Sequence, residues 1–154
     1  MEELRKILLA EDSPKDVELT LEALAEHHLA NQVIVVKDGV EVMDYLRCQG
    51  KYNLRKPGLP AVLLLDIKMP RMDGLEVLQT VRSDPALRLL PVVILSSSRE
   101  EQDLMRSYEL GVNAYVVKPV EFKDFVQAVK QIGAFWAIIN AVPPESMLSK
   151  RSKS

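Results

Sequence analysis

The sequence predicts a doubly wound α/β domain built on a five-stranded parallel sheet with strand order 2-1-3-4-5. Five short apolar runs are continuous rather than alternating, which is typical of strands covered by helices on both faces. Segments with helical periodicity separate these runs, so that strand and helix alternate five times. The short connections favour right-handed crossovers. This strand order places the carboxyl ends of the first and third strands beside the switch point where ligands bind.

The expected strands are the apolar runs at residues 6–10, 32–36, 61–66, 92–96 and 114–118. The first helix has the clearest start, because Ser13 is a good N-cap, Pro14 suits the first helical position and Asp16 follows three residues after the cap. Five apolar stripes predict the helices: Val17, Leu21 and Leu24; Val40, Met43, Tyr45 and Leu46; Leu75, Leu78 and Val81; Leu104, Tyr108 and Leu110; and Phe122, Phe125, Val126, Val129, Ile132 and Trp136.

Length and composition indicate one globular domain. The chain has 154 residues, of which 47% are hydrophobic and 27% charged. We expect a single domain over residues 1–142 with an extended last helix, a polar flexible tail over residues 143–154 and no output domain. The segment from residue 49 to 60 is a basic connection interrupted by Pro and Gly.

Charge and cysteine content exclude several classes of function. A formal net charge of −2 gives no reason to expect direct nucleic-acid binding. The single cysteine, Cys48, cannot form an internal disulfide, and the start of the chain does not resemble a signal peptide, so we expect a cytoplasmic protein. No apolar run approaches the ~20 residues that cross a bilayer, so we expect no membrane span.

Polar residues stand where the predicted strands end. Glu11 and Asp12 follow the first strand, Asp66 ends the third, Ser96 the fourth and Lys118 the fifth. Because the carboxyl ends of parallel strands meet at one edge of the sheet, three carboxylates, a hydroxyl and an ammonium should converge on one crevice.

Three carboxylates in one crevice repel each other, and each like pair costs on the order of 4 kcal/mol at ~4 Å and an effective dielectric near 20. Lys118 supplies one compensating charge. A hard divalent ion held by oxygen ligands would supply two more, and a small oxygen-only cluster suits Mg²⁺. Protonation of one acid is the other solution, and the sequence does not choose between them.

Four sequence blocks carry a family resemblance. "AEDS", "LLLDIKMPRMDG", "VVILSSS" and "AYVVKPV" resemble the signature blocks of the bacterial response-regulator receiver domain, which has a flavodoxin-like fold. Their order and spacing fit from about Arg5 to about Gly133. The agreement of separate blocks makes the resemblance specific, whereas a lone "DG" or "KP" would mean little.

The resemblance implies roles for the residues at the strand ends. Asp66 would be the phosphoacceptor, Ser96 would bond one phosphoryl oxygen and Lys118 another. Mg²⁺ would be held by the following groups: the side chains of Glu11, Asp12 and Asp66 and the backbone carbonyl of Lys68.

The same resemblance implies a phosphorylation switch rather than a turnover enzyme. A histidine kinase or a small acyl phosphate would donate the phosphoryl group, and the domain would catalyse both its own phosphorylation and its slow dephosphorylation. Ser96 would move inward and Tyr115 would change rotamer, which would remodel the face formed by the fourth helix, fifth strand and fifth helix. Taken alone, Tyr115 is equally well explained as a core residue.

Two features are particular to this chain. The side chains of Lys68 and Ser98 could flank the water that attacks the phosphoryl group, so the phosphorylated lifetime does not follow from the family. The end of the last helix is unusually apolar, which suggests a partner or a homodimer; its apolar residues are Phe135, Trp136, Ile138, Ile139 and Val142.

A finer resemblance concerns the partner. Four features are similar to the stand-alone regulators that accompany phytochrome-type histidine kinases: the long loop before the third strand, the later block "SYELGVNAYVVKPV", the "FW" of the last helix and the lack of an output domain. Several of those regulators dimerise through their fourth and fifth helices. We therefore expect a phytochrome-type kinase as the partner and a homodimer through this face.

Other functions compete with the switch. A flavodoxin-like enzyme needs an anion-welcoming loop after the first strand, but here that loop begins with Glu11 and Asp12. An aspartyl phosphatase would place a second acid two residues after Asp66, where Lys68 stands. A protein-interaction module of the same fold that works without phosphorylation remains the main alternative.

Overall fold

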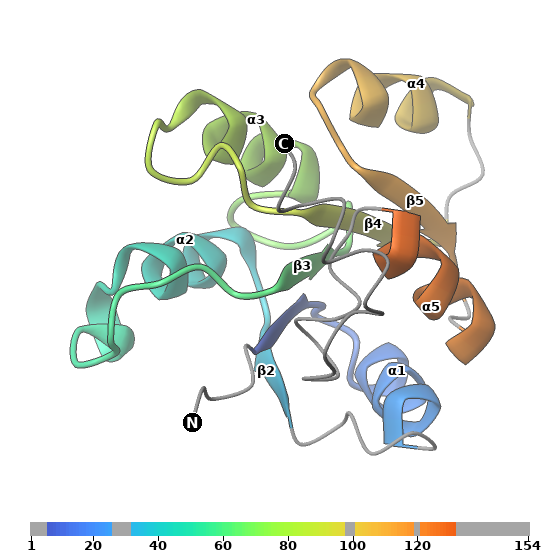
Figure 1. Ribbon diagram of the computed structural model, residues 1–154, viewed down its shortest axis with the longest axis horizontal. Coiled ribbons are helices and arrows are strands. Elements are labelled where there is room, and N and C mark those ends of the chain that lie inside the picture. Colours follow the sequence, from blue (N-terminus) through green and yellow to red (C-terminus); the bar gives the residue numbers. More distant parts are fainter. Residues whose placement is uncertain (1–5, 26–31, 98–100, 119–120, 132–154) are drawn as a thin grey trace, which may run out of the picture.

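The computed structural model describes residues 6–25, 32–97, 101–118 and 121–131 (Figure 1). Its elements alternate strand and helix along the chain, as the sequence predicts. They are β1 (Ile7–Ala10), α1 (Pro14–Ala25), β2 (Val33–Val36), α2 (Gly39–Arg47), a short 3-10 helix η2 (Gly50–Tyr52), β3 (Val62–Leu65), α3 (Gly74–Ser83), β4 (Val92–Ser96), α4 (Glu101–Glu109), β5 (Ala114–Val117) and α5 (Phe122–Gln131).

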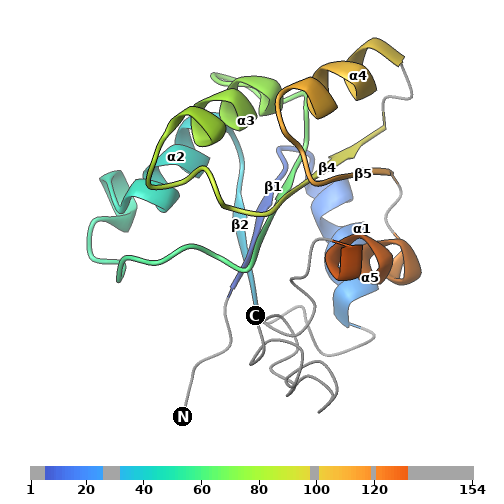
Figure 2. The same cartoon turned by 45° about the horizontal axis from the view of Figure 1, so that its top comes forward.

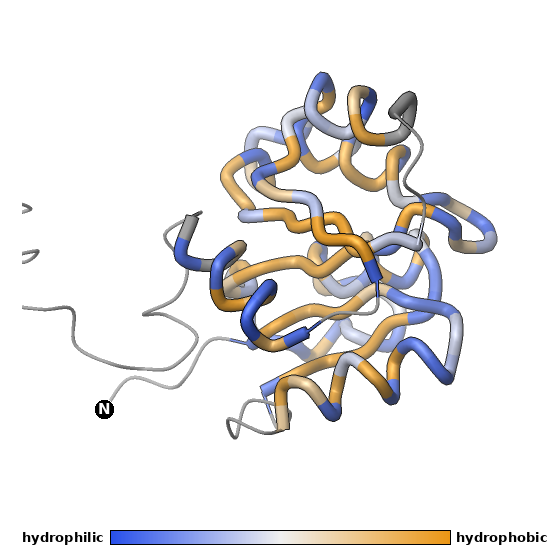
Figure 3. The backbone as a smooth tube through the Cα atoms, turned by 90° about the vertical axis from the view of Figure 1, so that its right-hand side faces the viewer, coloured by the Kyte–Doolittle hydropathy of each residue, from blue (hydrophilic) through white to orange (hydrophobic). Residues whose placement is uncertain are grey.

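The five strands form one parallel sheet in the order β2-β1-β3-β4-β5, which confirms the predicted topology. Each expected strand agrees with the observed one to within one residue at either end. The continuous apolar runs locate the strands well because the central strands are buried on both faces. Figure 3 shows the strands as the apolar interior of the molecule, surrounded by helices of mixed hydropathy.

Helices cover both faces of the sheet (Figure 2). Alternate strand residues point to opposite faces, so each strand contributes to two separate clusters. Leu8, Leu63 and Ile94 belong to the cluster beneath α2 and α3. Leu9 and Leu64 belong to the cluster beneath α1 and α5. Membership of these two clusters therefore shows on which face of the sheet the residues at the strand ends lie.

The start of α1 follows the predicted cap. The backbone N–H of Asp16 donates to Ser13 Oγ at 3.3 Å, and Pro14 is the first helical residue. Leu24 is fully buried at the end of the same helix, and Val17 packs against its cluster. The cap and the buried residues together fix the position and rotation of α1 on the sheet, and so determine where Asp16 of its first turn lies.

The fourth helix forms where its apolar stripe predicts it, but much of that stripe is exposed. The side chains of Leu104 and Tyr108 are 39% and 52% exposed. Ser107 is fully buried instead. Helical spacing predicted the helix correctly, but the small Ser107 rather than the larger residues faces inward.

Two glycines allow the loop between β3 and α3 to pack closely. The N–H of Gly39 donates to the Met72 carbonyl at 3.0 Å, and a Cβ at Gly39 would collide with that carbonyl. A Cβ at Gly74 would collide with the backbone carbonyl of Asp66. Asp73 is the N-cap of α3 and forms a capping box with Glu76, so its role is structural.

Some expectations fall on residues outside the described part of the chain. These are the side chain of Ser98, the apolar residues of the extended last helix from Phe135 to Val142, and the polar tail over residues 143–154. In the part that the structure describes, every helix is too short or too polar to span a membrane.

Candidate functional site

The register of the central strands brings two acids together. Ala10 pairs with Leu65, so the next residues, Glu11 and Asp66, leave neighbouring strands side by side. The Asp66 N–H donates to the Ala10 carbonyl at 3.0 Å, which extends the pairing to the point where the acids begin. Both acids are nearly enclosed, with 3% and 7% of their surface exposed.

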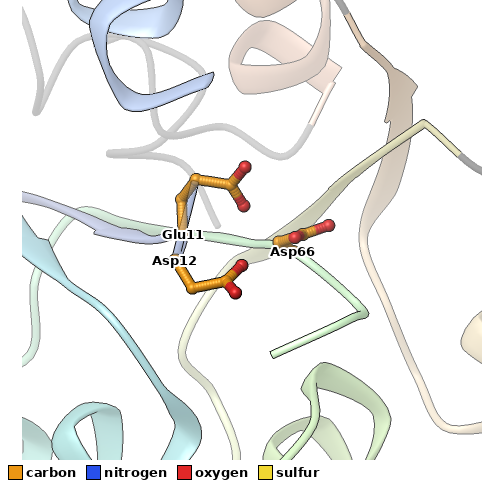
Figure 4. Close-up of side chains that lie close together, drawn as sticks. All are labelled: Glu11, Asp12 and Asp66. Atoms are coloured by element: carbon orange, nitrogen blue, oxygen red, sulfur yellow. The ribbon is translucent and has the colours of Figure 1, made fainter. Parts of the chain in front are cut away.

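Asp12 completes a group of three carboxylates. It is exposed at the mouth of the site, and one oxygen each from Glu11, Asp12 and Asp66 lies within 4.8 Å of the others. Figure 4 shows the carboxylates of Glu11 and Asp12 directed toward the side on which Asp66 lies. The structure thus assembles the three acids that the sequence placed at the strand ends.

Lys118 enters the same group from the edge of the sheet. Its backbone N–H donates to the Ser96 carbonyl at 2.9 Å, which fixes it at the end of β5. Its Nζ donates to Glu11 Oε1 at 2.6 Å and lies 3.6 Å from Asp66 Oδ1. Only 10% of the Lys118 side chain is exposed, so these contacts are largely shielded from water.

Strand alternation divides the remaining residues between the two faces of the sheet. Lys118 follows Ala114 and Val116 at two-residue spacing, so it lies on the same face as these residues, in the direction of the cluster beneath α1 and α5. Ser96 lies two residues after Ile94, so its side chain is on the opposite face of the sheet. Tyr115 packs against the cluster on that face. Ser96 is 2% exposed. The two predicted switch residues therefore share a face, while Lys118 approaches from the other.

Burial and the neighbouring Asp66 carboxylate raise the pKa of Glu11 to about 9, although Lys118 opposes the shift. Burial alone would lower the pKa of Lys118, but its hydrogen bonds to Glu11 and Asp16 raise it above its usual value. Protonation of one acid, the second solution to the charge problem, therefore operates when no divalent ion is bound. Lys118 is protonated, and Glu11 retains a proton at neutral pH.

The donor set also fits a hard divalent cation. Within the part of the chain that the structure describes, Glu11 Oε2 is buried without a hydrogen-bond partner. An orphaned carboxylate oxygen beside two further carboxylates is a ligand set for Mg²⁺ or a similar ion. Lys68, whose carbonyl the resemblance adds to this set, lies exposed in the loop two residues after Asp66.

Sequence reasoning missed one member of the site. Asp16, in the first turn of α1, accepts a hydrogen bond from Lys118 Nζ at 2.9 Å. The sequence pattern assigned Asp16 only to the start of the helix, and the cap formed by Ser13 uses the backbone N–H of Asp16 rather than its carboxylate. One sequence feature could have indicated this role: Asp16 follows Asp12 by about one helical turn, in the helix that begins next to the end of β1.

Comparison with known proteins identifies the class. The model of the response regulator receiver domain matches residues 7–130, which is most of the chain. The protein therefore belongs to the response regulator receiver family. The five-stranded fold and the grouping of Glu11, Asp12, Asp66 and Lys118 agree with that assignment.

The similar proteins include response regulators that are named for phytochromes. Response regulator Rcp1 of Synechocystis sp. is 40% identical over 131 residues, which cover 84% of this chain and 87% of Rcp1. The structure of the bacteriophytochrome response regulator AtBRR has a TM-score of 0.82 and 59% identity, and covers 94% of this chain and 100% of AtBRR. That of the phosphorylated cyanobacterial phytochrome response regulator RcpA has a TM-score of 0.72 and 41% identity over 92% of this chain and 100% of RcpA.

A solved structure of Rcp1 is described as its Mn²⁺-bound form. It has a TM-score of 0.70 and 37% identity, and covers 91% of this chain and 99% of that one. The resemblance to phytochrome-associated regulators, which the sequence suggested, is thus confirmed at the level of both sequence and fold.

Proposed function

We propose that this receiver domain accepts a phosphoryl group on Asp66 from a phytochrome-type histidine kinase and acts as a phosphorylation switch. The observation that carries the proposal is the position of Lys118 Nζ, 3.6 Å from Asp66 Oδ1 in a group of three carboxylates. The similarity to AtBRR and to the phosphorylated regulator RcpA supports it.

The chemistry follows from what the site residues can do. An Asp66 oxygen attacks phosphorus, and the bond from phosphorus to the donor's imidazole nitrogen breaks while that nitrogen keeps the electron pair and takes up a proton. Lys118 would neutralise the phosphoryl oxygens, and the buried Ser96 would bond one of them; the 3.6 Å distance from Lys118 Nζ to Asp66 Oδ1 supports the role of Lys118. Water later cleaves the acyl phosphate, which returns Asp66 to its carboxylate form and releases phosphate.

We propose Mg²⁺ as the resident cofactor. Glu11, Asp12, Asp66 and the backbone carbonyl of Lys68 would hold it, and the buried, unpartnered Glu11 Oε2 supports this assignment. When bound, the ion supplies two positive charges against the phosphoryl oxygens. The Mn²⁺-bound form of the relative Rcp1 agrees with an acidic pocket that binds divalent ions.

The readout would involve Ser96 and Tyr115 on the α3 and α4 side of the sheet. Tyr115 is half-buried in β5, next to a hollow of about 550 Å³ that Tyr108 of α4 and Gln127 of α5 also line. Leu104, Met105 and Tyr108 expose large apolar surfaces on α4. We propose this α4–β5–α5 face as the signalling surface and as the homodimer contact, together with the apolar end of the last helix.

Phosphorylation can be tested by intact mass. After incubation with acetyl phosphate and Mg²⁺, the wild type should gain the mass of one phosphoryl group and Asp66→Asn should gain none. Asp73→Asn is a matched control in the same loop, because Asn also caps helices, and it should be phosphorylated like the wild type. Chelation of Mg²⁺ should suppress the adduct.

The alternative is an interaction module that works without phosphorylation. Absence of the adduct in the wild type, or its presence in Asp66→Asn, would contradict the proposed function. Sedimentation of the phosphorylated and unphosphorylated protein at tens of micromolar then tests the homodimer. A monomer in both states would contradict the dimer but leave the phosphoacceptor role intact.

A further inference from the structure

Lys118 is held away from the phosphoacceptor by an acid outside the predicted site. Its Nζ hydrogen-bonds Glu11 Oε1 at 2.6 Å and Asp16 Oδ2 at 2.9 Å, whereas Asp66 Oδ1 is 3.6 Å away. The last distance is longer than a hydrogen bond. In the resting site, two of the three ammonium donors are therefore committed to acids other than Asp66.

The two bonds differ in kind. Glu11 is buried beside Asp66 and belongs to the group of acids that suits a cation. Asp16 comes from α1 and its side chain is 34% exposed, at the outer border of the site. The Lys118 ammonium holds the pKa of Asp16 below its usual value despite some burial, so Asp16 is a full negative charge at neutral pH.

We propose that Asp16 is a positioning residue that competes with the incoming phosphoryl group for Lys118 and so limits the rate of phosphorylation. The inference rests on the proposed function, in which Lys118 bonds a phosphoryl oxygen. To reach that oxygen, Nζ must move toward Asp66 and weaken its bond to Asp16. The Asp16 charge also repels the added phosphoryl oxygens across the ammonium.

The competition affects the two directions of the switch differently. Phosphorylation starts with Lys118 bonded to Asp16 and ends with it bonded to the phosphoryl group, so removal of Asp16 lowers the barrier. Hydrolysis starts with Lys118 already bonded to the phosphoryl group, and the charge that Asp16 faces is similar in the acyl phosphate and in its transition state. Removal of Asp16 should therefore change phosphorylation more than hydrolysis.

Asp16→Asn in the full chain tests this directly. With acetyl phosphate and Mg²⁺, we expect phosphorylation about three- to tenfold faster than in the wild type, as for the loss of one partly exposed charged hydrogen bond. Hydrolysis of the phosphorylated protein should change by less than about twofold. Asp16→Glu retains the charge and should restore a rate close to that of the wild type.

Glu18→Gln is the matched control, because it removes one negative charge from an exposed position of the same helix. It should leave both rates unchanged. A role of Asp16 in stability alone, through its link between α1 and the end of β5, predicts a lower Tm with an unchanged or slower phosphorylation rate. Asp16→Asn should lower the Tm slightly and still accelerate phosphorylation.

Three outcomes would overturn the inference: an unchanged or slower phosphorylation rate in Asp16→Asn, an equal acceleration of both directions, or an equal effect of Glu18→Gln. Each of these requires a wild type that is phosphorylated on Asp66. Failure of the wild type to form the adduct would refute the proposed function itself and the inference with it, so the two failures are distinguishable.

Discussion

Two groups of charged residues in this protein are built differently. The strand-end cluster consists of Glu11, Asp12, Asp16, Asp66 and Lys118. The α2 flank consists of Asp38, Glu41, Lys51 and Arg71, which join α2 to the loops on either side of β3. Both contain acids and cations within hydrogen-bonding distance, but they differ in the ratio of the charges and in their exposure to water.

The α2 flank pairs each acid with its own cation. Arg71 donates to both oxygens of Asp38 at 2.8 to 3.0 Å, and Lys51 contacts Glu41 at 2.6 Å. Burial alone would raise the pKa of Asp38, but the Glu41 N–H and the Arg71 guanidinium hold it below its usual value. The side chains of Arg71 and Lys51 are 59% and 67% exposed, so these ion pairs contribute only modestly to the stability of the protein.

The strand-end cluster places four acids around one cation. Lys118 is 10% exposed and contacts three of them, and one buried oxygen of Glu11 has no partner among the described residues. Such an arrangement is costly in the metal-free protein, and it favours any added cation. An excess of buried acid over cations, rather than the number of charged residues, therefore distinguishes the site from the scaffold.

Loss of Lys118 should have the largest effect. Lys118→Gln keeps the approximate shape of the side chain but removes the only cation of the strand-end cluster, so we expect phosphorylation by acetyl phosphate to slow by about 100-fold or more. Time courses of intact mass with the wild type as reference measure this effect. A fall smaller than about tenfold would show that Lys118 is not the principal charge partner of the phosphoryl group.

Glu11 should make the metal-free protein less stable as the pH rises. Its pKa in the folded state is about 9, above the value of about 4.5 in the unfolded chain, so the folded state binds more protons in between. The free energy of unfolding should therefore fall between those values, by at most about 1.4 kcal/mol per pH unit.

Urea unfolding in EDTA at pH 6 and pH 8 measures the Glu11 effect. Glu11→Gln should reduce the difference between the two pH values, because Gln does not titrate, whereas Glu18→Gln should leave it unchanged. Equal pH dependence in Glu11→Gln and the wild type would contradict the assignment of the proton to Glu11.

The α2 flank should show the smallest effects, and only on stability. Arg71→Ala removes the bidentate pair with Asp38, so we expect a loss of about 0.5 to 1 kcal/mol in the free energy of unfolding and a phosphorylation rate within about twofold of the wild type. Lys51→Ala is the matched control and should lower the Tm less than Arg71→Ala does, because Lys51 makes a single contact with Glu41 and its side chain is 67% exposed. A tenfold slower phosphorylation in Arg71→Ala would contradict this prediction, because it would show that the α2 flank contributes to phosphorylation.

Much of the fold could be predicted from local sequence. Continuous apolar runs located the strands because both faces of the sheet are covered, and the Ser13-Pro14 signal located the start of α1. The apolar stripe of α4 predicted the helix, yet Leu104 and Tyr108 lie on its exposed side. Spacing determines which residues share a face, while packing decides which face is buried.

The sequence by itself determined the alternation of strand and helix and the placement of Glu11, Asp12, Asp66 and Lys118 at strand ends, because burial and chain direction act locally along each strand. Only the tertiary structure decided that Asp16 bonds Lys118 and that Arg71 pairs with Asp38. These contacts join residues 102 and 33 positions apart in the chain. Their geometry depends on how α1 and the β3–α3 loop pack on the sheet, and no local pattern of residues encodes that packing.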